Sequence, residues 1–252
     1  MSAYAQHATR RRDLPWALLL IAAASWALLA LWSGSELGRW LRHDYQPERL
    51  GAQLVALAGF ALGWTLMTLA MMAPAAGALL AAFARVAAHR PRPLALRLGV
   101  ACGFLGVWVA TGCAFRALDG GVHAAVDRSA WLSARPELVA AAGLLVAGAF
   151  QFAPAKRRCL TACRSPGSFV YRRWGRGRAG RDALVIGASF GLSCVGCCWA
   201  LMLVMFASSM SSFPLMSALT GVMASERARR IGDRLVRPLG AALVAAAIVV
   251  AA

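Results

Sequence analysis

The sequence predicts an all-α protein, a polytopic membrane helix bundle of about seven transmembrane helices that forms a single integral membrane domain over 1–252. Of its 252 residues, 60% are hydrophobic and only 15% are charged. A typical soluble domain is about 45–50% apolar and about 25% charged. Both departures indicate a chain that lies in a lipid bilayer, and they exclude a disordered chain, a coiled coil and a secreted disulfide scaffold.

Seven apolar stretches account for the predicted helices, since a spanning helix needs about 20 mainly apolar residues. The second stretch is long and is interrupted at Pro74, and the fourth is closed by Pro154. The sixth has only 15 residues, so six helices would span if it does not cross. The stretches are Leu14–Ser33, Gly51–Phe83, Leu94–Phe115, Glu137–Ala153, Ala183–Ser208, Met210–Ala224 and Leu235–Ala252.

The basic residues favour seven spans. The chain has 27 Lys and Arg against 10 Asp and Glu. Of the 27, 21 lie in four segments: before the first stretch, between the second and third together with Arg97 at the start of the third, between the fourth and fifth, and after the sixth. If the sixth stretch crosses, all four segments lie on one side. The positive-inside rule then places them, and the N-terminus, in the cytoplasm.

The largest basic segment is a predicted cytoplasmic loop, 155–182. In a soluble protein such an excess of positive charge would suggest a nucleic-acid partner. Here topology and contact with anionic lipid explain it. We therefore expect membrane lipid, and no nucleic acid, as a partner.

Glycines spaced four residues apart recur in the apolar stretches. Such pairs let helix backbones approach closely in lipid. They predict packing contacts and carry no functional meaning. The pairs are Gly59 and Gly63, Gly99 and Gly103, and Gly187 and Gly191.

The interiors of the second, third, fifth and sixth stretches contain no Asp, Glu or His. Proton-coupled transporters and hard-cation channels usually carry such residues inside the membrane. The sequence also has no carboxylate pair placed for acid–base chemistry, no phosphate-binding loop and no Ser-His-Asp set. We expect no enzyme, with a thiol redox activity as the exception left open.

Sulfur is concentrated in the fifth stretch. Cys194, Cys198, Met202 and Met205 share one helix face at about 100° per residue, and Cys197 flanks that face by roughly 60°. Three thiols within five residues are unusual in a membrane span. They form the core of the predicted site.

Further sulfur lies elsewhere in the chain. Met67 and Met71 share a face of the second stretch, whereas Met72 points elsewhere. Cys159 and Cys163 lie four residues apart in the basic loop, as a cytoplasmic docking or transfer pair. Met and Cys are also ordinary packing residues, so this alternative stays open for each methionine.

Thiolate and thioether ligands without His or carboxylate favour Cu(I). Iron–sulfur clusters usually need four Cys, and the intramembrane set has three. Zinc with three Cys and no nearby His is less natural. The predicted cargo is copper, as Cu(I), with zinc as the alternative, and the candidate metal ligands are Cys194, Cys197, Cys198, Met202, Met67, Met71, Met72, Cys159 and Cys163.

Four segments together resemble a bacterial family of predicted metal-binding integral membrane proteins, a domain of unknown function with a CxxCCW motif in a membrane helix. The resemblance covers about 60–230. It implies a polytopic bundle with a metal-related role, a multi-pass protein of the bacterial inner (cytoplasmic) membrane. The segments are WTLMTLAMMAP at 64–74, QFAPAKRRCL with CRSP within 151–166, GLSCVGCCWALM at 191–202, and 210–227 with Met216 and Glu226.

Three functions remain open on the sequence alone. The first is a soft-metal protein that transports Cu(I) or delivers it to a partner enzyme, with a metal donor or acceptor protein as partner. The second is a membrane thiol–disulfide redox protein. Cys194 and Cys197 have Cys-x-x-Cys spacing, whereas adjacent Cys197 and Cys198 would form a strained disulfide. The third is a structural or assembly subunit in which sulfur only packs.

Overall fold

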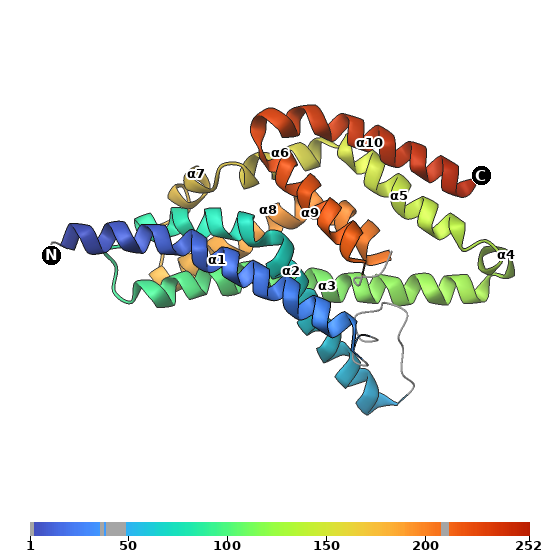
Figure 1. The fold of residues 1–252 in the computed structure, drawn as a ribbon, viewed down its shortest axis with the longest axis horizontal. Helices are drawn as coiled ribbons and strands as arrows, with labels where there is room; N and C mark the ends of the chain where they lie inside the picture. The colour runs from blue at the N-terminus through green and yellow to red at the C-terminus, as the bar shows by residue number, and fades with distance from the viewer. Residues whose placement is uncertain (1–2, 36–37, 39–48, 208–211) are drawn as a thin grey trace.

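The computed structural model describes residues 3–35, 38, 49–207 and 212–252, and the regular secondary structure of these ranges is helical throughout. The predicted all-α class is confirmed. Figure 1 shows the long helices packed side by side in a bundle, with the start of α1 and the end of α10 at opposite ends of it. The helices are α1 (Ala3–Ser33), α2 (Leu50–Val86), α3 (Pro93–Arg128), α4 (Ala130–Ser133), α5 (Glu137–Gln151), α6 (Pro154–Cys163), α7 (Pro166–Tyr171), α8 (Ala179–Ala207), α9 (Phe213–Arg227) and α10 (Arg229–Ala251).

Five helices are long and apolar enough to cross a membrane, and a sixth span results if the bent pair of α5 and α6 counts as one. The two halves of this pair meet at 69°. Pro154, in the first turn of α6, explains the break, because proline fits the start of a helix but cannot continue one. Helix α9 has 15 residues, so a seventh span stays a prediction. Its expected start at Met210 lies outside the described residues, which omit 208–211.

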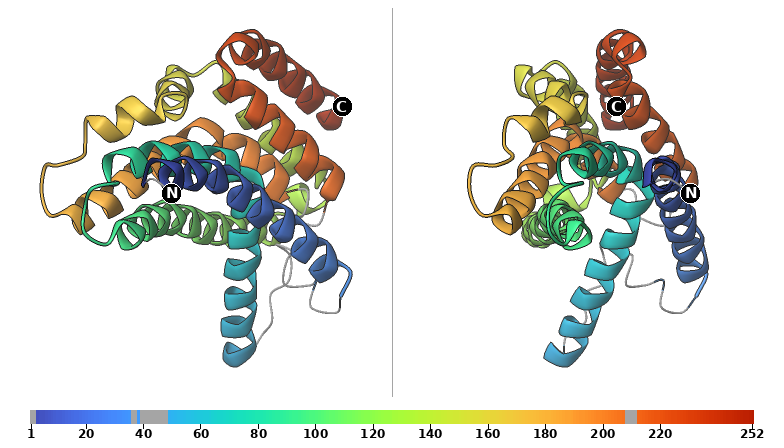
Figure 2. Two further views of the ribbon diagram at one scale, coloured as in Figure 1. Left: turned by 60° about the vertical axis from the view of Figure 1, so that its left-hand side comes forward. Right: turned by 90° about the vertical axis from the view of Figure 1, so that its left-hand side faces the viewer.

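Helix α2 bends where the sequence places Pro74. Its apolar parts on the two sides of this residue are Leu50–Ala73 and Ala75–Val86. Figure 2 shows these two limbs running in different directions. Proline lacks the amide hydrogen that the helix needs and thereby kinks it. The second limb turns toward α7, against which α2 packs.

Helices α3 and α8 pack closely through their glycines. A Cβ atom added at Gly103 would overlap the backbone of Leu184, and one added at Gly187 would overlap the carbonyl of Val100. Gly99 and Gly191 face the partner helix in the same way. The packing role predicted for these two glycine pairs is confirmed, and it holds α8 in the centre of the bundle.

The expected basic loop 155–182 contains more helix than predicted. It includes most of α6, all of α7 and the start of α8. Helix α3 likewise continues to Arg128, beyond the predicted end at Phe115. The loop segment and the end of α3 are both polar, so the hydrophobic pattern alone did not predict that they are helical. The fold of α6 has a direct consequence for the site, because α6 packs along α8.

The outer helices expose large apolar side chains. Leu31 of α1 and Val249 of α10 are about three-quarters exposed, at 74% and 75%. A soluble protein rarely exposes contiguous apolar surface of this kind, whereas lipid covers it. The buried core lies further in and includes Trp64 of α2, Trp108 of α3 and Phe190 of α8.

Candidate metal centre

Three cysteines of α8 lie in the core of the bundle. Cys194, Cys197 and Cys198 are at most 2% exposed. Helix α8 can present them inward because it packs against α3, α5, α6 and α9. These thiols are therefore shielded from the surroundings of the bundle, and their neighbours are side chains of the surrounding helices.

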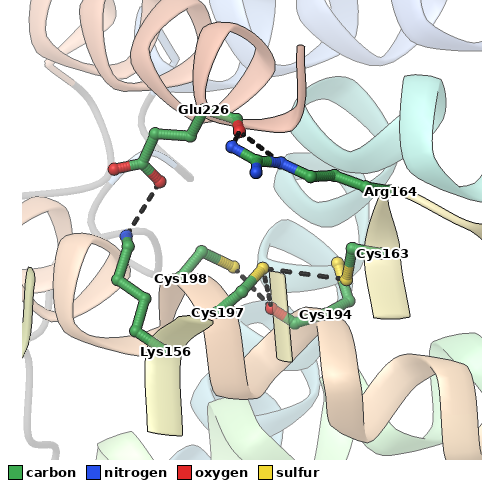
Figure 3. Close-up of polar contacts among 7 residues, drawn as sticks. All are labelled: Lys156, Cys163, Arg164, Cys194, Cys197, Cys198 and Glu226. Atoms are coloured by element: carbon green, nitrogen blue, oxygen red, sulfur yellow. Dashed lines mark hydrogen bonds and ion pairs between the residues drawn. The ribbon is translucent and has the colours of Figure 1, made fainter. Parts of the chain in front are cut away.

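One sulfur pair joins α6 to α8. The Sγ atoms of Cys163 and Cys197 lie 3.8 Å apart, and Cys163 is 5% exposed. Close approach of the two helices at this level depends on Gly196, since a Cβ there would overlap the Sγ of Cys159. Cys163, predicted as part of a separate cytoplasmic pair, thus lies beside the α8 cysteines (Figure 3).

A second sulfur pair joins α2 to α8. The Sδ atom of Met72 lies 3.8 Å from the Sγ atom of Cys194, and both residues are fully buried. The helical wheel separated Met72 from the face that Met67 and Met71 share, and the structure places the Met72 sulfur against Cys194. A wheel gives the angles between residues of one helix, but it does not say which of these angles meets a neighbouring helix.

The thiols of the Cys-x-x-Cys-Cys motif point back along their own helix. Cys197 and Cys198 donate to the carbonyl oxygen of Cys194, at 3.1 and 2.9 Å. Figure 3 shows Cys163, Cys194, Cys197 and Cys198 grouped around this carbonyl. Four thiols and one thioether are thereby gathered around one turn of α8.

A guanidinium group lies against this cluster. Nη2 of Arg227, the last residue of α9, lies 2.9 Å from Sδ of Met72 and 3.5 Å from Sγ of Cys194. Its Nε is buried and has no hydrogen-bond partner among the described residues. Sequence reasoning missed this contact, because Arg227 counted only as one of the basic residues after the sixth stretch.

A buried ion pair lies beside the cysteines and ties α6 to α9. Nζ of Lys156 lies 2.8 Å from Oε2 of Glu226, and both side chains are almost completely buried (Figure 3). Burial raises the pKa of the Glu226 carboxyl, and Lys156 acts against this rise. Arg164 donates to the carbonyl oxygen of Glu226 at 3.0 Å through Nε and pairs with Asp233 at 2.6 Å. These contacts hold Cys163, next to Arg164, against α8.

The sulfur spacing fits a soft metal ion. For metal–sulfur bonds of about 2.3 Å, ligand sulfurs lie about 3.8 Å apart at tetrahedral angles and about 4.0 Å apart in a trigonal plane. Both observed pairs have this spacing. In the part of the chain that the structure describes, however, no three His, Cys, Asp or Glu side chains are already arranged to hold one ion. A bound ion would recruit the thioether or turn a thiol away from the Cys194 carbonyl.

The other predicted ligands belong to the same hydrophobic core. Met67, Met71 and Met202 are buried, and Met202 follows Cys198 by one turn of α8. Cys159 is half-buried, with its sulfur over Gly196. Cys159 and Cys163 share α6 but have different surroundings, and their role as a docking or transfer pair stays a prediction.

Comparison with protein families gives an independent result. Residues 61–250 match the family PpoB2, whose description is copper chaperone. This chain belongs to the PpoB2 copper chaperone family. The match begins in α2 and ends in α10, so it includes every candidate ligand. No curated protein and no solved structure matches the chain.

Membership of the PpoB2 family supports the copper-related interpretation of the sulfur cluster. Sequence reasoning located the α8 cysteines because they lie within five residues. It missed the partners that other helices supply. One signal was available: Lys156 and Glu226 are charged residues at the edges of apolar stretches, where an unpaired charge is costly.

Proposed function

We propose that this member of the PpoB2 family is a membrane-embedded copper chaperone, which binds Cu(I) through buried sulfur atoms and passes it to a copper-using partner protein. The observation that carries the proposal is the pair of sulfur contacts at 3.8 Å, to which three different helices contribute. Sulfur atoms from α2 and α6 meet two of the three cysteines that the sequence places on α8.

The proposed ligands are the sulfur atoms that make these contacts, Met72, Cys163, Cys194 and Cys197, with Cys198 adjacent. Thiolates bind Cu(I) strongly, whereas a thioether is a neutral and weaker ligand. A site that mixes the two can hold copper and still exchange it with the thiols of a partner. Met67, Met71 and Met202 would form the soft, water-free surroundings of the ion, and Cys159 would receive copper from a donor.

The proposal places the chain in the bacterial inner membrane with seven spans and a cytoplasmic N-terminus. The apolar outer surface, the grouping of the arginines and the opposite positions of the two ends of the bundle in Figure 1 support it. Labelling of single cysteines placed at 90 and at 252 with a membrane-impermeant maleimide tests it. We expect labelling from the cytoplasmic side at 90 and from the outer side at 252, and labelling of both from one side would require an even number of spans.

Metal content of the purified protein tests the function. The wild type and the Cys194→Ser/Cys197→Ser/Cys198→Ser variant would be purified in detergent under anaerobic, reducing conditions, loaded with Cu(I) and washed. We expect about one copper per chain in the wild type and none in the variant, as determined by mass spectrometry of bound metal. Zinc would be measured in the same samples.

A matched control removes thiols outside the site. Cys102 and Cys113 of α3 are exposed and distant in the sequence from the motif, so Cys102→Ser/Cys113→Ser should retain copper. Copper lost equally from both variants would indicate nonspecific thiol binding. Absence of copper from the wild type after loading would contradict the proposed function.

Thiol–disulfide exchange is a second candidate function. The contact between Cys163 and Cys197 supports it, and it makes these two cysteines a better redox pair than those expected from the sequence. The two thiols would form one S–S bond and pass two electrons and two protons to a membrane quinone, which becomes a quinol. Nonreducing peptide mapping after quinone treatment tests this function. A Cys163–Cys197 peptide with quinol produced in equal amount would support it, and two free thiols would exclude it.

A further inference from the structure

The guanidinium of Arg227 contacts sulfur lone pairs that the proposed site would use to bind Cu(I). Its Nη2 is 2.9 Å from the thioether of Met72 and 3.5 Å from the thiol of Cys194, the same two sulfurs that lie 3.8 Å apart. A thioether sulfur is a weak acceptor. One lone pair of Met72 cannot accept from the guanidinium and bind a metal ion in the same direction.

The guanidinium of Arg227 makes few hydrogen bonds in this position. Its Nε is buried and lacks a hydrogen-bond partner among the described residues. The neighbouring carboxylate of Glu226 accepts from Lys156 through Oε2, and its Oε1 is buried without a hydrogen-bond partner among the described residues, so this carboxylate makes no hydrogen bond with the guanidinium. A buried charge is costly unless it is paired and fully hydrogen-bonded. Arg227 therefore gains little from its contact with sulfur, and another cation can replace it there at a modest cost.

We propose that Arg227 is a displaceable cation of the copper site: its guanidinium occupies the space between Met72 and Cys194, leaves when Cu(I) enters, and returns when copper is handed on. The inference rests on the proposed function and adds a role to it. A protein that delivers copper must release it, and a side chain that competes for the ligands lowers the affinity and speeds release.

Arg227→Leu tests the proposal by removing the competing charge without adding a sulfur atom that could itself bind Cu(I). Because a hydrogen bond from a charged group is lost only when copper binds to the wild type, we expect Arg227→Leu to bind Cu(I) about tenfold or more tightly. Affinity would be measured by anaerobic competition with a chromophoric Cu(I) chelator, and release by the rate of copper transfer to that chelator. Release should slow by a similar factor.

Two further variants complete the experiment. Arg234→Leu removes an exposed arginine of α10 and should behave as the wild type. Arg227→Gln removes the charge but keeps a neutral hydrogen-bond donor, so its affinity should lie between those of the wild type and Arg227→Leu. It also decides the question if Arg227→Leu does not fold, since a folded Arg227→Gln variant with wild-type affinity and release would overturn the proposal.

The outcomes separate this inference from the function on which it rests. Copper bound by the wild type with equal or weaker binding by Arg227→Leu would overturn the displacement role alone. No copper in the wild type or in any variant would overturn the proposed function, and the displacement role with it. Copper bound only by Arg227→Leu would also overturn both, since the guanidinium would then block the site in the wild type and would not leave when Cu(I) is added.

Discussion

The ammonium of Lys156 and the carboxylate of Glu226, 70 residues apart in the sequence, lie 2.8 Å apart in a place that is almost inaccessible to water. Removal of one partner from such a pair leaves an uncompensated buried charge and costs about 3–5 kcal/mol, whereas replacement of both by apolar residues is often neutral or stabilising. We predict that Lys156→Met destabilises the protein by this amount and that Lys156→Met/Glu226→Met restores most of it. Thermal unfolding in detergent would measure both.

The ion pair between Arg164 and Asp233 provides the control for that prediction. The Asp233 side chain is 71% exposed. An exposed pair contributes about 0–1 kcal/mol, so Asp233→Asn should change stability little. Equal losses from Asp233→Asn and Lys156→Met would contradict a special role for the buried pair.

Close packing of α3 on α8 predicts a steric cost at Gly187. An alanine there would place its Cβ against the carbonyl of Val100 and push the helices apart. Overpacking of this kind costs about 1–3 kcal/mol, and Gly187→Ala should lower the unfolding temperature. Gly106→Ala, also within α3, adds its Cβ where no atom lies within 4 Å and should leave stability unchanged or raised. A larger loss from Gly106→Ala would show that the glycines act through something other than close approach.

The bend in α2 predicts which methionine binds copper. Met72→Leu conserves volume but removes the sulfur beside Cys194. We expect its Cu(I) affinity to fall by at least about tenfold, as for changes close to a metal site. Met67→Leu should have the wild-type affinity in the same chelator competition. The reverse order would favour the straight-helix arrangement, in which Met67 and Met71 face the site.

Different surroundings of Cys159 and Cys163 predict different effects of their removal. Cys163→Ser eliminates the sulfur that contacts Cys197 and should weaken equilibrium binding of Cu(I). Cys159→Ser should leave this affinity unchanged and slow the loading of copper from a thiol donor, because its half-buried thiol lies beside the site. Equal losses of affinity in the two variants would indicate that both cysteines bind the same ion.

The sequence was sufficient for features that depend on neighbouring residues. Apolar stretches located the long helices, and glycines at spacing four identified the contact between α3 and α8. The three α8 cysteines were evident because a single helix turn holds them. In each case the residues that predict the feature lie in one segment or in two segments with the same pattern.

Features that depend on long-range packing were not predictable in this way. Met72 meets Cys194 across 122 positions of the chain, and Cys163 meets Cys197 across 34. The first contact depends on the direction of α2 near its bend. The second depends on α6, a polar helix that the hydrophobic pattern treated as a loop. Arg227 illustrates the same limit, because a positive-inside count gives every arginine the same meaning.

The bend of α2 also has a mechanical consequence. Met72 lies two residues from Pro74, so it is about 3 Å from the pivot, while the far end of the first limb at Leu50 is about 36 Å away. A rotation of about 10° about this pivot would carry that end through about 6 Å but would move the backbone at Met72 by only about 0.5 Å. The thioether thus lies close to the axis of rotation, and the distance between Met72 and Cys194 changes little when the outer part of the helix moves.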